Sequence, residues 1–527
     1  MAQAAAAGGG RFRAGVWLWV GAFLLYAATS PGNLPGDTQT RWSVARRLVR
    51  GEGFSLESEG VTWNYAVGKD GKPYYLTGLG QIVLLAPLAG LGLALERWGV
   101  AGAGTADLAG QFLAAELLFP ALGALGVWLA YRVVRRLGYS ERAAVGTAAV
   151  LGLGTMHWHY AVVAQEASQV AAALLGAAWL MVENRARGRF VYALGACVLL
   201  GAALGFRLAE ATAALPMFLA AAVSEAAGAG RGQRARAAVK WVAAGLLGVG
   251  PALACWGWYD WARFGSVWET GYGAASAQWL GGHGMFESRA AATLAAMLFS
   301  PGKSIFLYNP ALLPAAAGWV WFWRREGWLA AAVGGAVGAN FIFYSFFTAW
   351  AGDYAWSIRY QAVVLGLLVL PIAGVLERVG RSGRWVKAGL AGLVAASAAI
   401  QGASLVYNFH LEFVQNPNHG LIPDGYVWDW SQSHLRMRFE NLGRHAAGRR
   451  SFSSAAVAKE DPALMKVRRR EAVVREAHEV NFFPFKARAK LGGGRVFYGL
   501  LGLWAAAAAG WGAVAYRVGR WYSSGSE

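Results

Sequence analysis

Runs of roughly 20 apolar residues recur along most of the chain, and short polar or basic segments separate them. A helix of about that length crosses the hydrocarbon core of a bilayer. The pattern predicts an all-α polytopic membrane protein with about twelve transmembrane helices. The expected spans are 14–30, 109–131, 143–162, 167–183, 190–206, 209–224, 240–259, 304–323, 328–348, 360–376, 386–406 and 496–514.

A further apolar segment, residues 78–96, is also long enough to span. Counting it would place nearly every later short basic loop outside, although basic residues concentrate in inside loops. We therefore expect this segment to lie in the membrane interface or to re-enter, with both termini inside and a large first outer loop at 31–108. The predicted organisation is a transmembrane unit at 1–406, a basic outer segment at 407–495, and a last span with an inner tail at 496–527.

The stretch Pro31–Arg50 opens the first outer loop. Two prolines and two glycines end the first span, and Asp37 follows about seven residues later. Apolar and arginine positions then alternate at a helical spacing, which is typical of a basic helix on a membrane surface. Asp37 has two interpretations: a cap for this helix, since Asp is a good N-cap, or a chemical group at the water–lipid boundary.

Composition narrows the class of protein. Hydrophobic residues make up 56% of the 527 residues, and the 26 tryptophans fit aromatic belts at membrane interfaces. The net charge of +19 would suggest a nucleic-acid partner in a soluble protein, but here basic residues cluster at span ends, so we expect none. Cys197 and Cys255 lie inside apolar runs, so we expect no disulfide.

Acids and cations from several outer loops are predicted to share one face of the membrane. Glu166 at a span start has the alternative of favouring a helix dipole, and Lys303 and Arg359 have the alternative of snorkelling at the interface. The convergence favours a site where cations hold a lipid phosphate and a carboxylate deprotonates a hydroxyl. The other candidates for substrate binding are Lys72, Tyr74, Tyr75, Arg207, Arg263, Glu269, Tyr272 and Asp353.

Six stretches in this region resemble one family. They are GDTQTRW (36–42), YYLTGLGQIVLLAPL (74–88), QEAS (165–168), RFGSVWETGY (263–272), SPGKSIFLYNP (300–310) and WAGDYAWSIRY (350–360). In this order they resemble the C-type integral-membrane glycosyltransferases (GT-C), the group of aminoarabinose transferases and protein O-mannosyltransferases. The resemblance covers most of residues 15–376 and is nearest to bacterial members.

The resemblance implies a GT-C fold with juxtamembrane helices in the first loop, in a bacterial inner membrane with the active site facing the periplasm. It implies inverting transfer of a sugar from a polyprenyl phosphate to an unidentified acceptor, with Asp37 as base and Glu166 as second acid. Thr38 stands where relatives often carry another acid, and Leu76 and Thr77 where they often carry a lysine. The sequence therefore assigns no metal ligands and leaves a divalent cation open.

Other functions compete with this interpretation. One is a non-catalytic membrane scaffold whose basic tail binds anionic partners, but the outer acids and cations argue against it. A transporter of lipid-linked glycans should carry ionisable residues deep in its spans and broken helices near the midplane. A ligase or polymerase would act on whole glycans at the same face. Charges here sit mostly at span ends, which favours the sugar transferase.

Overall fold

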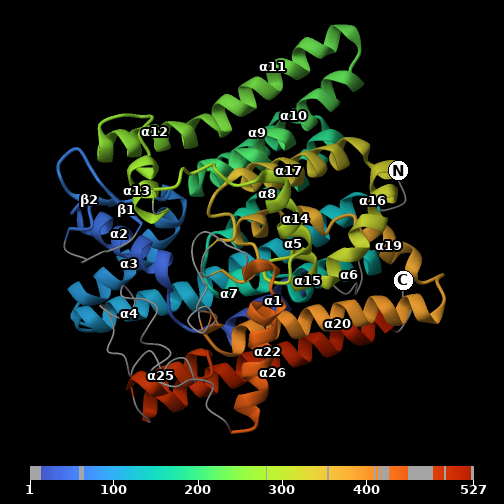
Figure 1. The fold of residues 1–527 in the computed structure, drawn as a ribbon. Helices are drawn as coiled ribbons and strands as arrows, with labels where there is room; N and C mark the ends of the chain where they lie inside the picture. Colours follow the sequence, from blue (N-terminus) through green and yellow to red (C-terminus); the bar gives the residue numbers. More distant parts are fainter. Residues whose placement is uncertain are drawn as a thin grey trace.

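The computed structural model describes residues 14–57, 64–280, 282–352, 355–408, 411–412, 416, 426–448, 479–491 and 494–523. Helices account for nearly all regular structure in these residues, so the predicted all-α class is confirmed (Figure 1). A single hairpin of two short strands, β1 (Tyr65–Val67) and β2 (Pro73–Tyr75), interrupts the helices of the described chain.

Helices of very different lengths form the main bundle. They are α1 (Ala14–Thr29), α5 (Phe119–Arg136), α6 (Glu141–Gly154), α7 (His157–Val162), α8 (Ala167–Arg187), α9 (Phe190–Phe206), α10 (Ala211–Gly228), α11 (Arg231–Gly248), α12 (Gly250–Phe264), α14 (Ala290–Phe299), α15 (Ile305–Tyr308), α16 (Leu313–Arg325), α17 (Gly327–Phe346), α18 (Leu365–Leu368), α19 (Ile372–Val379), α20 (Arg384–Val406) and α26 (Arg495–Ser523). Small buried residues, such as Ala171 and Ala178 of α8, let α8 pack closely against α5 and α9.

Every predicted span coincides with one or more of these helices. Within the described residues, seven helices are long and apolar enough to cross a membrane, and an eighth is obtained if the pair 359–368 and 372–379, bent by 47°, is one span. The protein is therefore a multi-pass membrane protein, and the count of twelve stays a prediction. The segment Leu79–Arg97 is among the seven.

A separate layer of elements covers one end of the bundle (Figure 1). It consists of α2 (Gly36–Arg50), α3 (Leu79–Arg97), α4 (Ala103–Leu113), the hairpin and α13 (Tyr272–Trp279). Helix α3 packs along α2 and α4, and its interfacial position stays a prediction. Its start touches the end of α9: a Cβ on Gly78 would lie 2.4 Å from the carbonyl oxygen of Gly205. We call this end of the bundle the outer end.

Three short helices, η2 (Leu208–Glu210), η3 (Pro310–Leu312) and η4 (Arg359–Val364), join helices of the bundle. A π-helical turn, η1 (Ala114–Leu118), joins α4 to α5. The described part of 407–495 contains η5 (Tyr426–Trp428), η6 (Trp430–Gln432), α22 (His434–Ala446) and α25 (Phe483–Leu491). This part is fastened to the outer end, since Gly302 donates its backbone N–H to the Val427 carbonyl.

The first and last described helices begin and end at the same end of the bundle. Helix α26 packs along α1, and the Arg517 guanidinium lies 5.3 Å from the centre of the Trp17 ring. Trp17 belongs to the first turn of α1 and Arg517 to the last turns of α26. Trp17 and Arg517 therefore lie at the same end of the bundle, and the number of crossings between them stays a prediction.

This topology can be tested by cysteine labelling. In a Cys255→Ser background, we expect Ser431→Cys to react from the outer side, because Ser431 is exposed and neighbouring Ser433 bonds the Pro301 carbonyl at the outer end. We expect Ala235→Cys to react only after permeabilisation. Ala235 lies near the start of α11, which continues into α12 as a span of 34 residues, and the far end of α12 contacts the hairpin. The measurement is labelling of intact cells by an impermeant maleimide; the reverse pattern would contradict the topology.

Candidate active site

Asp37 lies in the first turn of α2 and does not cap it. The N-cap residue is Pro35, and no side chain caps this helix. The Asp37 carboxylate instead faces two groups from distant parts of the chain: Oδ1 accepts a hydrogen bond of 2.7 Å from Asn64 Nδ2, and Oδ2 lies 3.7 Å from Arg359 Nη1. The cap interpretation of Asp37 is therefore wrong, and its side chain, 21% exposed, is open to a ligand.

Glu166 is a counter-ion for two arginines. It precedes α8, and its side chain forms ion pairs with Arg41 (2.8 Å) and with Arg207. Burial raises the pKa of Glu166, but Arg41 and Arg207 outweigh burial and hold that pKa well below its usual range. A carboxylate held ionised in this way is a poor proton acceptor, so Glu166 acts through the arginines that it fixes.

Arg41 is a central residue of the site. Its sequence pattern predicted only a position on a surface helix. Its side chain is only 2% exposed. Besides Glu166, it donates from Nε to Thr77 (3.1 Å) and from Nη1 to Gln81 Oε1 (2.6 Å). The Arg41 contacts therefore join α2 to the start of α3. An arginine in an amphipathic pattern gives no signal of such burial, since its partners lie about 40 and 125 residues away.

Tyr360 lies between two guanidinium groups. The ring of Tyr360 stacks on Tyr344, with centroids 4.5 Å apart. Arg207 and Arg359 lie 5.1 and 5.0 Å from the Tyr360 ring centre, and Arg359 Nη2 donates to the Tyr360 hydroxyl (3.1 Å). Aromatic faces attract cations, so this stack keeps both arginines near Asp37 and Glu166. The Arg359 Nε has no hydrogen-bond partner among the described residues.

Lys303 supports the loop that carries Arg359. Its fully buried ammonium donates to the carbonyls of Ala355 (2.8 Å) and Ser357 (3.2 Å). These carbonyls precede Arg359 by four and two residues. The lysine therefore fastens this loop from behind, which differs from the direct contact with substrate that the sequence suggested.

The other predicted residues lie around this cluster at different depths. Tyr75 is fully buried beneath Arg41, and burial raises the pKa of its hydroxyl well above the usual value. Burial also raises the pKa of Tyr272, which lies near enough to feel the charge of Arg207. Arg263 is fully buried, where it pairs with Asp260 and donates to the Tyr75 carbonyl.

Three predicted residues have partners of their own, and one is not described. Lys72 pairs with the exposed Glu57 (3.2 Å), Tyr74 donates to Asp70 (2.8 Å), and Glu269 accepts from the backbone of Gly271 (2.8 Å). Asp353 lies outside the described residues. The structure thus brings together Asp37, Glu166, Arg207 and Arg359, as the sequence predicted, and adds Arg41, Asn64 and Gln81, which it did not.

The described residues contain no group of three or more His, Cys, Asp or Glu side chains that could hold a metal ion.

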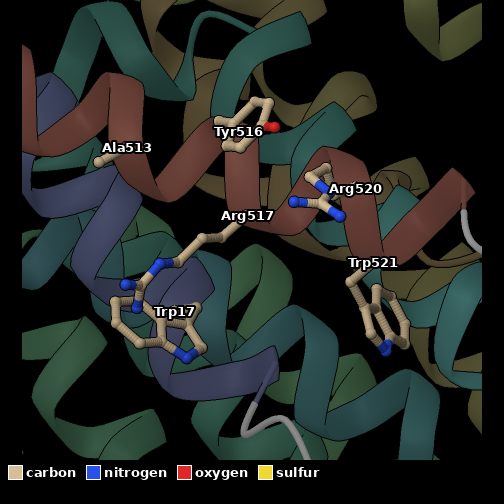
Figure 2. A pocket seen from close by; sticks show the side chains of 6 residues that line it. All are labelled: Trp17, Ala513, Tyr516, Arg517, Arg520 and Trp521. Atoms are coloured by element: carbon tan, nitrogen blue, oxygen red, sulfur yellow. The ribbon is translucent and has the colours of Figure 1, made fainter.

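A groove of about 450 Å³ lies between the first turns of α1 and the last turns of α26 (Figure 2). Its side chains are those of Trp17, Ala513, Tyr516, Arg517, Arg520 and Trp521. Asp37 follows the other end of α1. The groove therefore lies about 24 Å, the length of that helix, away from Asp37 and its neighbours.

The paired state of Glu166 predicts a pH-dependent stability. Glu166→Gln leaves two arginines without their shared counter-ion, and we expect a loss of about 3 kcal/mol at pH 7. Because the folded-state pKa of Glu166 is depressed, its stabilisation is complete above the unfolded value of about 4.3 and is lost as the pH falls below it. Thermal melting of both proteins in detergent from pH 7 to pH 3 should show their difference shrinking; a constant difference would contradict the assignment.

Comparison with known proteins gives a similarity of fold. No protein-family model matches the chain, and no curated protein matches it by sequence. The structure is similar to ArnT from Cupriavidus metallidurans bound to undecaprenyl phosphate, with 15% identity over 94% of this chain and 77% of that one and a TM-score of 0.47. It is also similar to the apo oligosaccharyltransferase of Archaeoglobus fulgidus, with 16% identity over 80% of this chain and 60% of that one and a TM-score of 0.46. These likenesses, to two GT-C glycosyltransferases, concern the general arrangement of helices alone.

Proposed function

We propose that this protein transfers a sugar from a polyprenyl-phosphate donor to an acceptor hydroxyl at the outer end of the bundle, with inversion at the sugar carbon. The observation that carries the proposal is the contact between the side chains of Asp37 and Arg359. A carboxylate and a guanidinium, 21% and 23% exposed, lie 3.7 Å apart without a close hydrogen bond. The loose pair offers a base and a phosphate-binding cation side by side.

The charge of the cluster supports an anionic ligand. Three guanidinium groups, of Arg41, Arg207 and Arg359, surround the two carboxylates of Asp37 and Glu166. Counted over these five groups alone, one positive charge is in excess in a largely buried site. Arg41 and Arg207 already bond Glu166, so Arg359 is the cation best placed to bind a phosphate with two donors.

Binding of the donor would also activate the base. A phosphate binding Arg359 competes with Asp37 for the guanidinium and separates the 3.7 Å pair. The Asp37 carboxylate is then available to the acceptor hydroxyl. In this way the base becomes free only when the leaving group is already held, which limits reaction of an empty site.

The reaction is a single displacement. The acceptor hydroxyl gives its proton to Asp37, and its oxygen bonds to the anomeric carbon on the face opposite the phosphate. The bond between that carbon and the phosphate oxygen breaks, and the electron pair leaves with the polyprenyl phosphate. Arg359 stabilises the charge that develops there. Phosphate is a good leaving group, so no strong general acid is needed.

In this proposal the remaining predicted residues either hold the site in place or contact the donor or the acceptor. Glu166 fixes Arg41 and Arg207, Lys303 fixes the loop of Arg359, and Arg263 fixes the hairpin through the Tyr75 carbonyl. Tyr272 would contact the donor, and the buried Tyr75 would support Arg41 from beneath. Lys72, Tyr74 and Glu269 would contact the acceptor, and the same role is proposed for Asp353, which lies outside the described residues. We place the site on the periplasmic side of a bacterial inner membrane, as the motif resemblance implies.

One structural feature favours the alternative of a lipid-linked glycan transporter. The segments 359–368 and 372–379 form a pair bent by 47°, directly after Arg359. Broken helices next to a binding site are typical of transporters. The two functions can be separated with detergent-solubilised protein, which has no membrane barrier. An enzyme should still release polyprenyl phosphate from its sugar. A transporter should make no product.

The role of Arg359 can be tested by donor binding. We expect Arg359→Ala to weaken the binding of polyprenyl phosphate at least about tenfold, because a charge-assisted bidentate contact is lost. Arg359→Lys should recover only part of the affinity, because lysine lacks the planar fork. Titration calorimetry in detergent measures both.

Arg381→Ala is the matched control. It removes the same charge from an exposed position in the turn between α19 and α20. This control should bind the lipid as the unmodified protein does. Equal affinities of the Arg359→Ala and Arg381→Ala proteins would remove Arg359 from the phosphate site.

A further inference from the structure

Unusual backbone conformations gather at the site. Three residues other than glycine have a positive φ in the described chain: Asn64 (54°), Ala164 (59°) and Ser357 (56°). The Ala164 carbonyl accepts hydrogen bonds from Thr38 and Gln81, and the Ser357 carbonyl accepts from Lys303. Side chains rarely adopt this region without strain, and such strain persists where surrounding contacts impose it.

Asn64 differs from the other two because its side chain contacts the proposed base. It directly precedes β1, and its carbonyl accepts the N–H of Leu76, just beyond β2. The hairpin therefore fixes the backbone of Asn64, and the left-handed conformation directs its amide toward α2. There Nδ2 donates to Asp37 Oδ1 at 2.7 Å. Asparagine tolerates this conformation better than most residues.

The two carboxylates of the site are held by different chemistry. Glu166 is bound by two guanidinium groups, whose charge makes it a poor base. The Asp37 carboxylate accepts a hydrogen bond from a neutral amide. A neutral donor fixes the plane of a carboxylate without adding a full positive charge. It also occupies only one oxygen, so Oδ2 keeps its direction toward Arg359 and the space where the ligand would bind.

We propose that Asn64 is a positioning residue for the general base: its amide holds Asp37 Oδ1 so that Oδ2 is presented to the acceptor hydroxyl. The proposal rests on the proposed function, in which Asp37 takes the proton. It assigns to the β1–β2 hairpin the task of orienting the reacting oxygen, in addition to covering the outer end.

Two substitutions that tolerate a positive φ test the proposal. Asn64→Gly keeps the backbone conformation and deletes the amide. We expect kcat to fall at least about tenfold while the KM for the donor stays within twofold, because placement is lost and phosphate binding is not. The thermal melting temperature should stay close to that of the unmodified protein. The assay is release of polyprenyl phosphate from the sugar donor.

Asn64→Asp keeps the shape and replaces the donor by a second carboxylate. The described groups that face Asp37 are Arg359 from η4, Arg41 from α2 and Tyr75 from β2. These are unchanged in the variant, so the new like charge alone makes Asp37 retain its proton to higher pH. We expect low activity at pH 7, because the amide that holds Asp37 is lost, and an acidic limb of the kcat profile displaced upward by about one pH unit. A merely structural role for Asn64 would not move this limb.

Asn33→Asp is the matched control, because Asn33 lies in the same outer loop and contacts Lys486 rather than the site. It should leave both kcat and the pH profile unchanged. Full activity with an unshifted profile in both Asn64 variants would overturn the proposal. If Asp37→Asn is inactive in the same assay, only the role of Asn64 fails; if Asp37→Asn is fully active, the proposed function itself fails.

Discussion

The ion pairs of Glu166 with Arg41 and Arg207 are the constraint on which the outer site depends. They join three parts of the chain, namely α2, the start of α8 and the turn after α9. The guanidinium groups of the buried Arg41 and the partly buried Arg207 would be costly to leave without a counter-ion, so these elements do not separate easily. Because α2 is fixed in this way, Asp37 in its first turn has a defined position.

The rest of the site is built on that fixed position from two sides. The hairpin directs the Asn64 amide to one oxygen of Asp37, and the Lys303 ammonium fastens the loop that brings Arg359 to the other. Both supports are polar side chains bonded to backbone or carboxylate groups, which are directional contacts. The result is a carboxylate with one oxygen held and one oxygen opposite an accessible cation.

Much of this arrangement could be predicted from the sequence. Apolar runs located the helices, and the distribution of basic loops placed Asp37, Glu166, Arg207 and Arg359 at the same end. These predictions worked because the bilayer imposes length and charge rules on every span. Rules of this kind act on segments, so they say which end of a helix a residue occupies and little about its partner.

The remaining features depend on contacts between distant residues. Arg41 has the spacing of a surface arginine, and its burial follows only from Glu166, 125 positions later. Asn64 lies in a loop without any periodic pattern, and its importance follows from a left-handed backbone that the hairpin imposes. Lys303 was expected among the outer cations that hold a lipid phosphate, yet its ammonium bonds two carbonyls. The number of spans also stays open, since short helices such as α7 and α15 interrupt the apolar runs.

The most direct test of the account is a comparison of binding and turnover in Asp37→Asn. Asparagine keeps the shape of the side chain but cannot accept the acceptor's proton. The purified variant should bind polyprenyl phosphate as tightly as the unmodified protein. With candidate polyprenyl-phosphate sugars and a membrane extract as acceptor, it should release lipid phosphate at most about a hundredth as fast. Release at the unmodified rate would show that Asp37 is not the base and would contradict the central claim.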